Sequence, residues 1–223
     1  KTGAAFSVRF LRNGDQITVV RNVIDSAGNG AALFQVVDTT TGTPFPDWTQ
    51  TENQPIIQLG IRSAAGYPTE ITNVAWAYDG KTLNFTYNGS TWVTANNDSS
   101  FQARINGNYY ELKIVANLAS KTAVSNKQIS YEVSYSSNAH SDTLQGSIDV
   151  LIQQAGSNSH ILQITTNRVE LDASNTTATL TAVAAFGSTP VSIGTNDYAI
   201  EWYQDNVKLS GQTGATLIVN RDM

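Results

Sequence analysis

Short segments in which every second residue is large and apolar recur along the whole chain. Tyr131, Val133 and Tyr135 form one such series, and residues 148–152 form another. This period of two is typical of a pleated strand that buries one face. Clusters of Gly, Asn and Ser separate these segments, as expected for turns between strands.

The alternating segments predict about a dozen short strands. An Asn-Gly pair at residues 13–14 indicates a hairpin between the first two. We expect strands at residues 6–10, 17–20, 33–37, 55–61, 70–78, 82–87, 109–115, 129–135, 147–152, 161–165, 168–171, 178–184, 198–203 and 215–219. Helical periodicity is limited to residues 115–125, which could hold one turn. Many short strands divided by turn residues favour β-sandwiches over an α/β fold, so we predict an all-β protein.

A small polar stretch at residues 155–159 divides the chain. It follows the strand predicted at residues 147–152 and precedes the one at residues 161–165. We predict two immunoglobulin-like β-sandwiches in tandem. Residues 1–155 form the first, with extra N-terminal strands, and residues 156–223 form the second. The alternative is a long loop inside a single domain.

A repeated motif favours the two-domain interpretation. Trp76 is followed by an Asp three residues later and by Leu83 seven residues later, and Trp202 and Leu209 have the same spacing. In immunoglobulin-like domains a Trp on the third strand fills the space between the sheets, so we expect these four residues to be structural core. The distance between the copies is far longer than the ~20–50-residue period of solenoid repeats, which favours domain duplication.

The second sandwich is expected to be incomplete. An immunoglobulin-like domain needs about seven strands and ~100 residues, more than residues 156–223 supply. A sheet left in this state exposes an apolar face and an unpaired edge. We therefore expect residues 156–223 to be less well ordered than the first domain, or to self-associate through the open sheet.

Composition narrows the classes of function. Charged residues make up 14% of the chain and the net charge is −5, so Ser, Thr, Asn and Gln must supply much of the polar surface. Such a surface suits extracellular or virion proteins. No basic patch is present, so nucleic-acid binding is not expected. No apolar run approaches the ~20 residues of a membrane span, so we expect no membrane insertion. The absence of Cys excludes disulfides and thiol chemistry.

No recognisable catalytic motif is present. The sequence lacks the signatures of nucleophile elbows, phosphate loops, dinucleotide sites and zinc proteases. His140 and His160 lie in polar turns without a nearby partner, and we interpret both as solvated. Asp38 and Asp47 bracket a loop whose oxygens could hold calcium, but without EF-hand spacing. We therefore predict that the chain is not an enzyme and uses no cofactor or metal.

Two tryptophans in loop-like segments are the candidate ligand-binding residues. Trp92 ends the segment Asn-Gly-Ser-Thr-Trp, and Trp48 follows Pro-Phe-Pro-Asp. An exposed ring in either place could stack on a sugar or contact a partner. The alternative is that each ring folds back to cap an open end of the sandwich, which the stiff flanking prolines favour for Trp48.

Several short motifs resemble phage and prophage structural proteins of Bacteroidetes, which are tail- or virion-associated chains with immunoglobulin-like repeats. The resemblance rests on residues 46–49 (Pro-Asp-Trp-Thr), 53–57 (Asn-Gln-Pro-Ile-Ile), 112–114 (Leu-Lys-Ile), 117–120 (Asn-Leu-Ala-Ser), 147–152 and 201–203 (Glu-Trp-Tyr). It covers most of the chain through short segments. It implies a role in assembly or host contact, with no catalytic residues to carry over.

The leading hypothesis is a structural or adhesive module of a phage or prophage particle, acting as a spacer or weak host-surface binder. Its partners would be other virion or cell-surface proteins and surface glycans. Weak contacts of this kind gain strength from copy number. The alternatives are a secreted or cell-surface carbohydrate-binding or adhesion module, and an accessory domain of a larger hydrolase.

Overall fold

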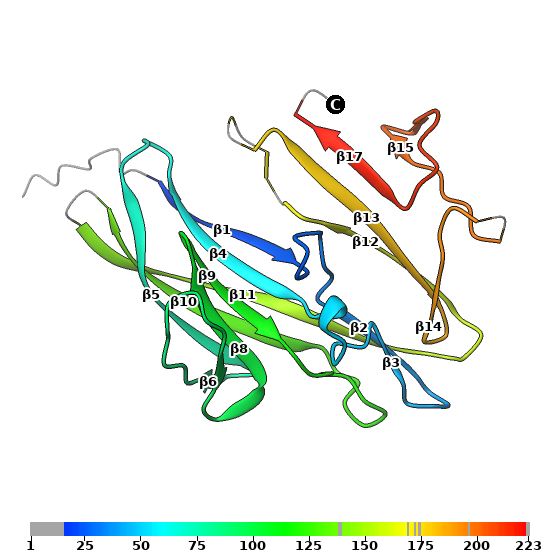
Figure 1. Cartoon of the computed structure of the whole chain (residues 1–223), viewed down its shortest axis with the longest axis horizontal. Coiled ribbons are helices and arrows are strands. Elements are labelled where there is room, and N and C mark those ends of the chain that lie inside the picture. The colour runs from blue at the N-terminus through cyan, green and yellow to red at the C-terminus, as the bar shows by residue number, and fades with distance from the viewer. Residues whose placement is uncertain are drawn as a thin grey trace, which may run out of the picture.

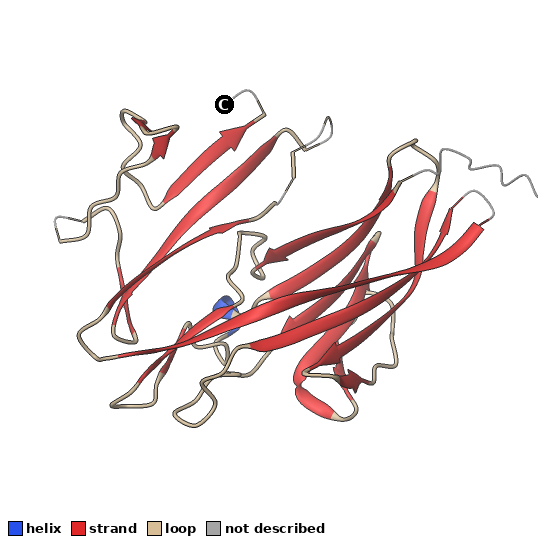
Figure 2. Ribbon diagram, turned by 180° about the vertical axis from the view of Figure 1, so that it is seen from behind, coloured by secondary structure: helices blue, strands red, loops and turns tan. Residues whose placement is uncertain are grey.

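The protein is built almost wholly from β-strands. A computed structural model describes residues 16–137, 140–168, 170–171, 173, 175–195 and 197–221. This part of the chain contains seventeen strands and one 3-10 turn, η1 (Thr51–Asn53) (Figure 2). The prediction of an all-β sandwich fold is confirmed. Within the same residues, no helix has the length and apolar character that crossing a membrane requires.

Two sheets face each other in the N-terminal sandwich (Figure 1). The five-stranded sheet has the order β1 (Ile17–Ile24), β4 (Ile56–Ser63), β9 (Tyr109–Ile114), β8 (Asp98–Asn106) and β7 (Val93–Ala95). The six-stranded sheet has the order β3 (Pro44–Phe45), β2 (Phe34–Asp38), β11 (His140–Ala155), β10 (Lys127–Ser137), β5 (Thr69–Tyr78) and β6 (Lys81–Leu83). Neighbouring strands are antiparallel except β11 and β2, which pair in parallel.

The core lies between these sheets. It consists of the inward-facing residues of both, among them Trp76, Phe101, Leu112 and Ile129, each almost completely buried. The indole Nε1 of Trp76 donates a hydrogen bond to the hydroxyl of Tyr87, and burial raises the pKa of that phenol to about 12. Because Trp76 is large and its only polar atom is satisfied, it can fill the space between sheets without an unpaired group.

The C-terminal part contains a smaller sheet. Strand β13 (Thr177–Phe186) pairs with β12 (His160–Thr166) on one side and with β14 (Thr189–Val191) and β17 (Thr216–Asn220) on the other. A separate hairpin joins β15 (Tyr203–Gln204) and β16 (Val207–Lys208). The buried cluster of this part comprises Ala182, Trp202 and Leu217, with Leu209 packed against it. It is much smaller than the core of the first sandwich.

The two Trp motifs form the same local structure. Trp76 pairs with Leu83 across the β5–β6 hairpin, and Leu209 N–H donates to the carbonyl of Trp202 across β15–β16. The central turn residues have positive φ in both hairpins: 46° and 78° at Asp79 and Gly80, and 49° and 66° at residues 205 and 206. Two consecutive positive φ angles define the type I′ turn, which suits Gly, Asn and Asp.

Several predicted strands differ from the structure. The strand expected at residues 82–87 ends at Leu83, and of residues 198–203 only Tyr203 lies in a strand. Residues 168, 170 and 171 form no strand, residues 115–125 form no helical turn, and residues 6–10 lie outside the described residues. Strand β8 was not predicted. Its apolar residues Phe101, Ala103 and Ile105 alternate as expected, but the small Ala103 and the polar start of the segment weaken the pattern.

The C-terminal sheet contacts the first sandwich directly. Thr165 on β12 donates a hydrogen bond of 2.9 Å to the carbonyl of Gly30, and Ser157 donates one of 3.1 Å to Asp38. Arg62 on β4 forms an ion pair of 2.9 Å with Glu170. A Cβ atom at Gly30 would collide with backbone atoms of Thr166. We call this set of contacts the junction. The predicted boundary at residues 155–159 lies at the turn between β11 and β12 and remains a prediction.

Candidate functional site

Trp92 lies on the outer face of the five-stranded sheet. It directly precedes β7 at the sheet edge and is half-buried. The guanidinium carbon of Arg104 is 4.2 Å from the centroid of its ring system, and Nζ of Lys113 is 4.4 Å from the same point. Both distances are within the ~6 Å range of cation–π attraction. The ring therefore lies against two cations that come from neighbouring strands.

The sheet register explains why these cations face outward. Arg104 on β8 is paired with Glu111 on β9, and Lys113 is paired with Gln102. The residues that alternate with them, such as Ala103 and Leu112, are fully buried in the core. Because successive side chains of a strand point to opposite faces, Arg104, Glu111 and Lys113 all lie on the outer face.

Glu111 fixes the position of Arg104. Its side chain is only 1% exposed, and it accepts hydrogen bonds from Arg104 Nε at 2.6 Å, Gln58 Nε2 at 2.6 Å and Asn106 Nδ2 at 3.1 Å. A buried carboxylate is tolerated when it is paired and hydrogen-bonded in this way. The charge of Arg104 is therefore balanced within the protein.

Lys113 is the cation that remains available. In the described part of the chain it forms no ion pair with a carboxylate, and burial together with the nearby charge of Arg104 lowers its pKa. An anionic group beside Nζ would oppose both effects through Coulomb attraction. We call Trp92, Arg104, Lys113, Glu111 and Gln58 the Trp92 face. Its chemistry suits an acidic sugar, with the ring as an apolar surface and Lys113 as the anion contact.

Trp48 does not form the exposed platform that stacking on a ligand requires. Its exposed fraction is 0%, and its ring belongs to the core of the first sandwich. Its backbone N–H donates to Asn117 Oδ1 at 2.8 Å, and Asn117 Nδ2 donates to Asp47 Oδ1 at 2.7 Å. The alternative, that this ring folds back to close one end of the sandwich, agrees with its position.

The fully buried amide of Gln35 completes this network. Its Nε2 donates to the Pro46 carbonyl at 2.8 Å and to Asn117 Oδ1 at 2.6 Å, while its Oε1 accepts from the N–H groups of Leu118 and Ala119. A single side chain thus satisfies the backbone of two loops that are far apart in the sequence. This network holds Trp48 in place, and its distant members give no signal in the local sequence.

The acidic residues considered for calcium have other partners. Asp38 accepts from the N–H groups of Thr40 and Thr41, and the bond from Thr41 is the main reason why its pKa lies below the usual value. Burial favours a neutral Asp47, but hydrogen bonds from Asn117 and Thr49 prevail and its pKa is also lowered. Among the residues described, no three His, Cys, Asp or Glu side chains cluster as metal ligands.

The remaining predicted residues lie as follows. Trp76, Leu83 and Trp202 are buried, and Leu209 is partly buried against Trp202. His140 is exposed at the start of β11, and the exposed His160 ring packs near Phe186 and Tyr198.

Sequence reasoning missed Arg104, Lys113 and Glu111. The signal that could have identified them is their alternation with apolar residues in β8 and β9, two strands joined by a Gly-containing turn.

Comparisons with known proteins add no family or ligand. No protein-family model matches the chain, and no curated protein is significantly similar to it in sequence.

Proposed function

We propose that this chain is a non-enzymatic structural and adhesive module of a phage or prophage particle, in which it serves as a spacer. The junction is the observation that supports this proposal most strongly. A spacer must hold its two ends at a fixed distance and orientation. Neighbouring units that contact each other at several points do so better than units joined only by a flexible linker.

The contacts of the junction are distributed over its length. Gly30 lies against Thr166, the Arg62–Glu170 ion pair joins β4 to the segment after β12, and the Ser157–Asp38 bond lies at the turn where β11 ends. Strand β11 itself extends from its pairing with β10 to its pairing with β2 before this turn. Because two of these contacts lie away from the turn between β11 and β12, they oppose bending at that turn.

Electron microscopy with antibodies tests the location. Antibodies raised against this chain, bound to gold, are expected to label intact purified particles at one structure, such as the tail. Particles without this chain, made by deleting its reading frame, are the matched control. The proposal would be contradicted if intact particles bound no antibody and if the chain were also undetectable after the particles were disrupted.

The Trp92 face favours a second candidate function, which is binding of acidic surface polysaccharides by a secreted or cell-surface adhesion module. The half-buried Trp92 and the unpaired Lys113 support it. The test is binding to polygalacturonate and to uncharged dextran, with Trp92→Ala, Lys113→Gln and a control variant Lys121→Gln. Loss of polygalacturonate binding in the first two variants alone is expected. Equal binding to both polymers would contradict this candidate.

A further inference from the structure

Asn-Gly pairs are chemically reactive positions in a polypeptide, and the chain contains several of them. They lie at residues 13–14, 29–30, 88–89 and 106–107, and the structure describes the last three. In such a pair the backbone nitrogen of Gly can attack Cγ of the Asn side chain. A C–N bond forms, the side-chain nitrogen leaves as ammonia with the proton of the Gly amide, and water opens the resulting succinimide ring to aspartate or isoaspartate. Gly favours this step because no Cβ restricts the backbone rotation that it requires.

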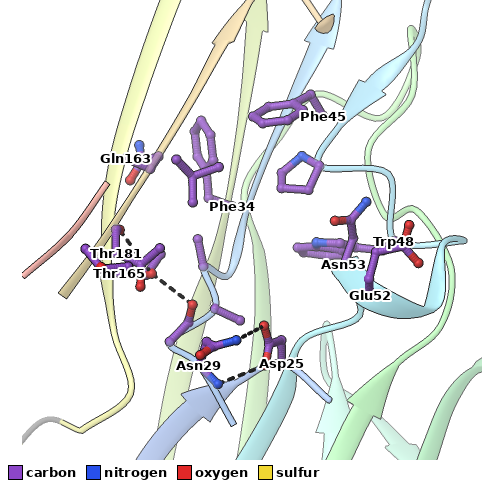
Figure 3. A pocket seen from close by; sticks show the side chains of 16 residues that line it. Asp25, Asn29, Phe34, Phe45, Trp48, Glu52, Asn53, Gln163, Thr165 and Thr181 are labelled. Atoms are coloured by element: carbon purple, nitrogen blue, oxygen red, sulfur yellow. Dashed lines mark hydrogen bonds between the residues drawn. The ribbon is translucent and has the colours of Figure 1, made fainter. Parts of the chain in front are cut away.

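The structure protects Asn29. Its Nδ2 donates to Asp25 Oδ2 at 3.1 Å, and its backbone N–H donates to Asp25 Oδ1 at 2.9 Å (Figure 3). Gly30 is buried, and its backbone lies so close to Thr166 that a Cβ atom would collide with it. Ring closure would have to release the Asn29 side chain from Asp25 and rotate a backbone that has no room to move. We therefore expect Asn29 to react slowly while the chain is folded.

Asn106 is exposed but is held by the sheet. It pairs with Tyr109 at the end of the β8–β9 ladder. Its Nδ2 donates at 3.1 Å to the almost fully buried carboxylate of Glu111. Attack by the Gly107 nitrogen would have to break this bond, so the reactivity of Asn106 should be intermediate.

Asn88 lies in a hairpin that is closed only by an isolated bridge to Thr91. Two backbone hydrogen bonds hold this turn, from Thr91 N–H to the Asn88 carbonyl at 3.1 Å and from Ile105 N–H to the Gly89 carbonyl at 2.9 Å. Asn88 and Gly89 are both exposed, and a Cβ atom on Gly89 would meet no atom within 4 Å. Among the described residues, none forms a hydrogen bond with the Asn88 side chain. Exposed segments with few backbone bonds open at a small cost in free energy.

We propose that Asn88 is a site of spontaneous deamidation in the folded protein. Its side chain is free, the Gly89 nitrogen is open to solvent, and the turn can rotate without disrupting a strand. Water is the only co-reactant. The site does not depend on whether the chain belongs to a phage particle.

Deamidation would change the charge and the backbone of this turn. Either product carries a carboxylate in place of a neutral amide, and isoaspartate also adds one methylene to the main chain. The turn directly precedes Trp92 and is bonded to β8 at Ile105, the residue after Arg104. If the Trp92 face binds anions, as the second candidate function holds, the new charge would oppose that binding.

Peptide mapping by mass spectrometry tests the proposal, and it detects deamidation whether or not the Trp92 face binds a ligand. The whole chain is incubated at mildly alkaline pH, either folded or unfolded in urea, and samples are digested with trypsin over time. Cleavage after Lys and Arg places the three Asn residues in different peptides, at residues 22–62, 82–104 and 105–113. Asn88→Gln assigns the signal, and Asn84→Gln is the matched control, because Asn84 lies in the same peptide but precedes Phe85.

In the folded chain, Asn88 is expected to deamidate at least about tenfold faster than Asn29, with Asn106 between them. In urea the three rates should converge, because each Asn is followed by Gly and the protection is lost. Asn88→Gln should remove the signal from residues 82–104, and Asn84→Gln should leave it unchanged. Three results would overturn the proposal: Asn88 reacts only in urea, Asn29 or Asn106 reacts as fast as Asn88 in the folded chain, or the signal persists in Asn88→Gln.

Discussion

At the scale of single residues, the buried polar side chains decide how the loops of the first sandwich are placed. Gln35 satisfies the backbone of two loops, and Asn117 links Asp47 to the backbone of Trp48. In the described part of the chain, no buried side-chain nitrogen or oxygen lacks a hydrogen-bond partner. A fully satisfied network of this kind favours one arrangement, because any other would leave buried groups unpaired.

Replacing Gln35 by Ala should therefore destabilise the protein strongly. The N–H groups of Leu118 and Ala119 and the carbonyl of Pro46 would lose their partner in a buried site. We expect a loss of about 3 kcal/mol in the free energy of unfolding, measured by urea denaturation. The exposed Gln153→Ala should change it by less than about 0.5 kcal/mol. Equal effects of the two substitutions would show that the network contributes nothing.

Acid should weaken the same network through Asp47. Its pKa is lowered in the folded state, so its contribution to stability is complete above the unfolded value of about 3.9 and is lost as the pH falls through the lowered folded value. The difference in unfolding free energy between the wild type and Asp47→Asn should be largest at neutral pH and shrink below about pH 4. A difference that stays constant from pH 7 to pH 3 would contradict this account.

Residue types alone could predict some of these roles but not others. Trp76 and Trp202, which share the Trp-Asp-Leu spacing, are both buried and are both followed by the same kind of turn, because turn chemistry is local. The burial of Trp48 depends on Asn117, a partner 69 residues away, and no local pattern reports such a contact. For the same reason the sequence predicted Trp92 but not the two cations beside it, which come from β8 and β9.

At the scale of elements, β12 and the loop before β2 determine how the C-terminal sheet meets the first sandwich. Gly30 allows the backbone of this loop to approach Thr166 closely. Thr165, one residue earlier on β12, is buried and bonded to the carbonyl of Gly30. The strands themselves could be predicted from alternation. The contact between Gly30 and β12 could not, because it joins a loop to a distant strand and no sequence pattern reports it.

Adding a single methyl group at Gly30 should open the junction. In Gly30→Ala the new Cβ would collide with the backbone of Thr166, which cannot move as a side chain would. We expect amide hydrogen exchange to accelerate at least tenfold in β12, with little change in β8 and β9. Gly214→Ala is the control for the same substitution away from the junction, because Gly214 has no positive φ and a Cβ there would meet only ordinary van der Waals contacts. Faster exchange throughout the chain would instead indicate global destabilisation.

Exposed apolar residues on the C-terminal sheet predict that the chain self-associates. Leu162 and Ile164 on β12 are 59% and 47% exposed, although they lie on the same sheet face as the buried Ala182. Exposed apolar residues on one sheet face favour association with a partner. Sedimentation velocity at rising concentration is expected to show oligomers, and Leu162→Lys with Ile164→Lys should reduce them.

Leu151→Lys is the control for this experiment, because Leu151 is also exposed but lies on β11 in the first sandwich. If Leu151→Lys lowers association as much as the double substitution on β12, the open C-terminal sheet is not the contact surface. A wild-type chain that stays monomeric at all concentrations would also contradict the prediction.

At the scale of the whole molecule, the spacer proposal requires that the two parts move as one body. The chain carries few charges, and among the described residues only one ion pair spans the junction, between Arg62 and Glu170. An exposed ion pair contributes little stability by itself. The packing at Gly30 and the Thr165 hydrogen bond must therefore hold most of the arrangement.

The most direct test of this claim is the measurement of amide residual dipolar couplings for the whole chain in weakly aligning medium. Couplings from β4, β8 and β9 define the alignment of the first sandwich, and those from β12, β13 and β17 define that of the C-terminal sheet. A rigid junction predicts that both sets fit one alignment tensor with the same magnitude. A markedly smaller tensor for one part would show independent motion and would contradict the spacer proposal.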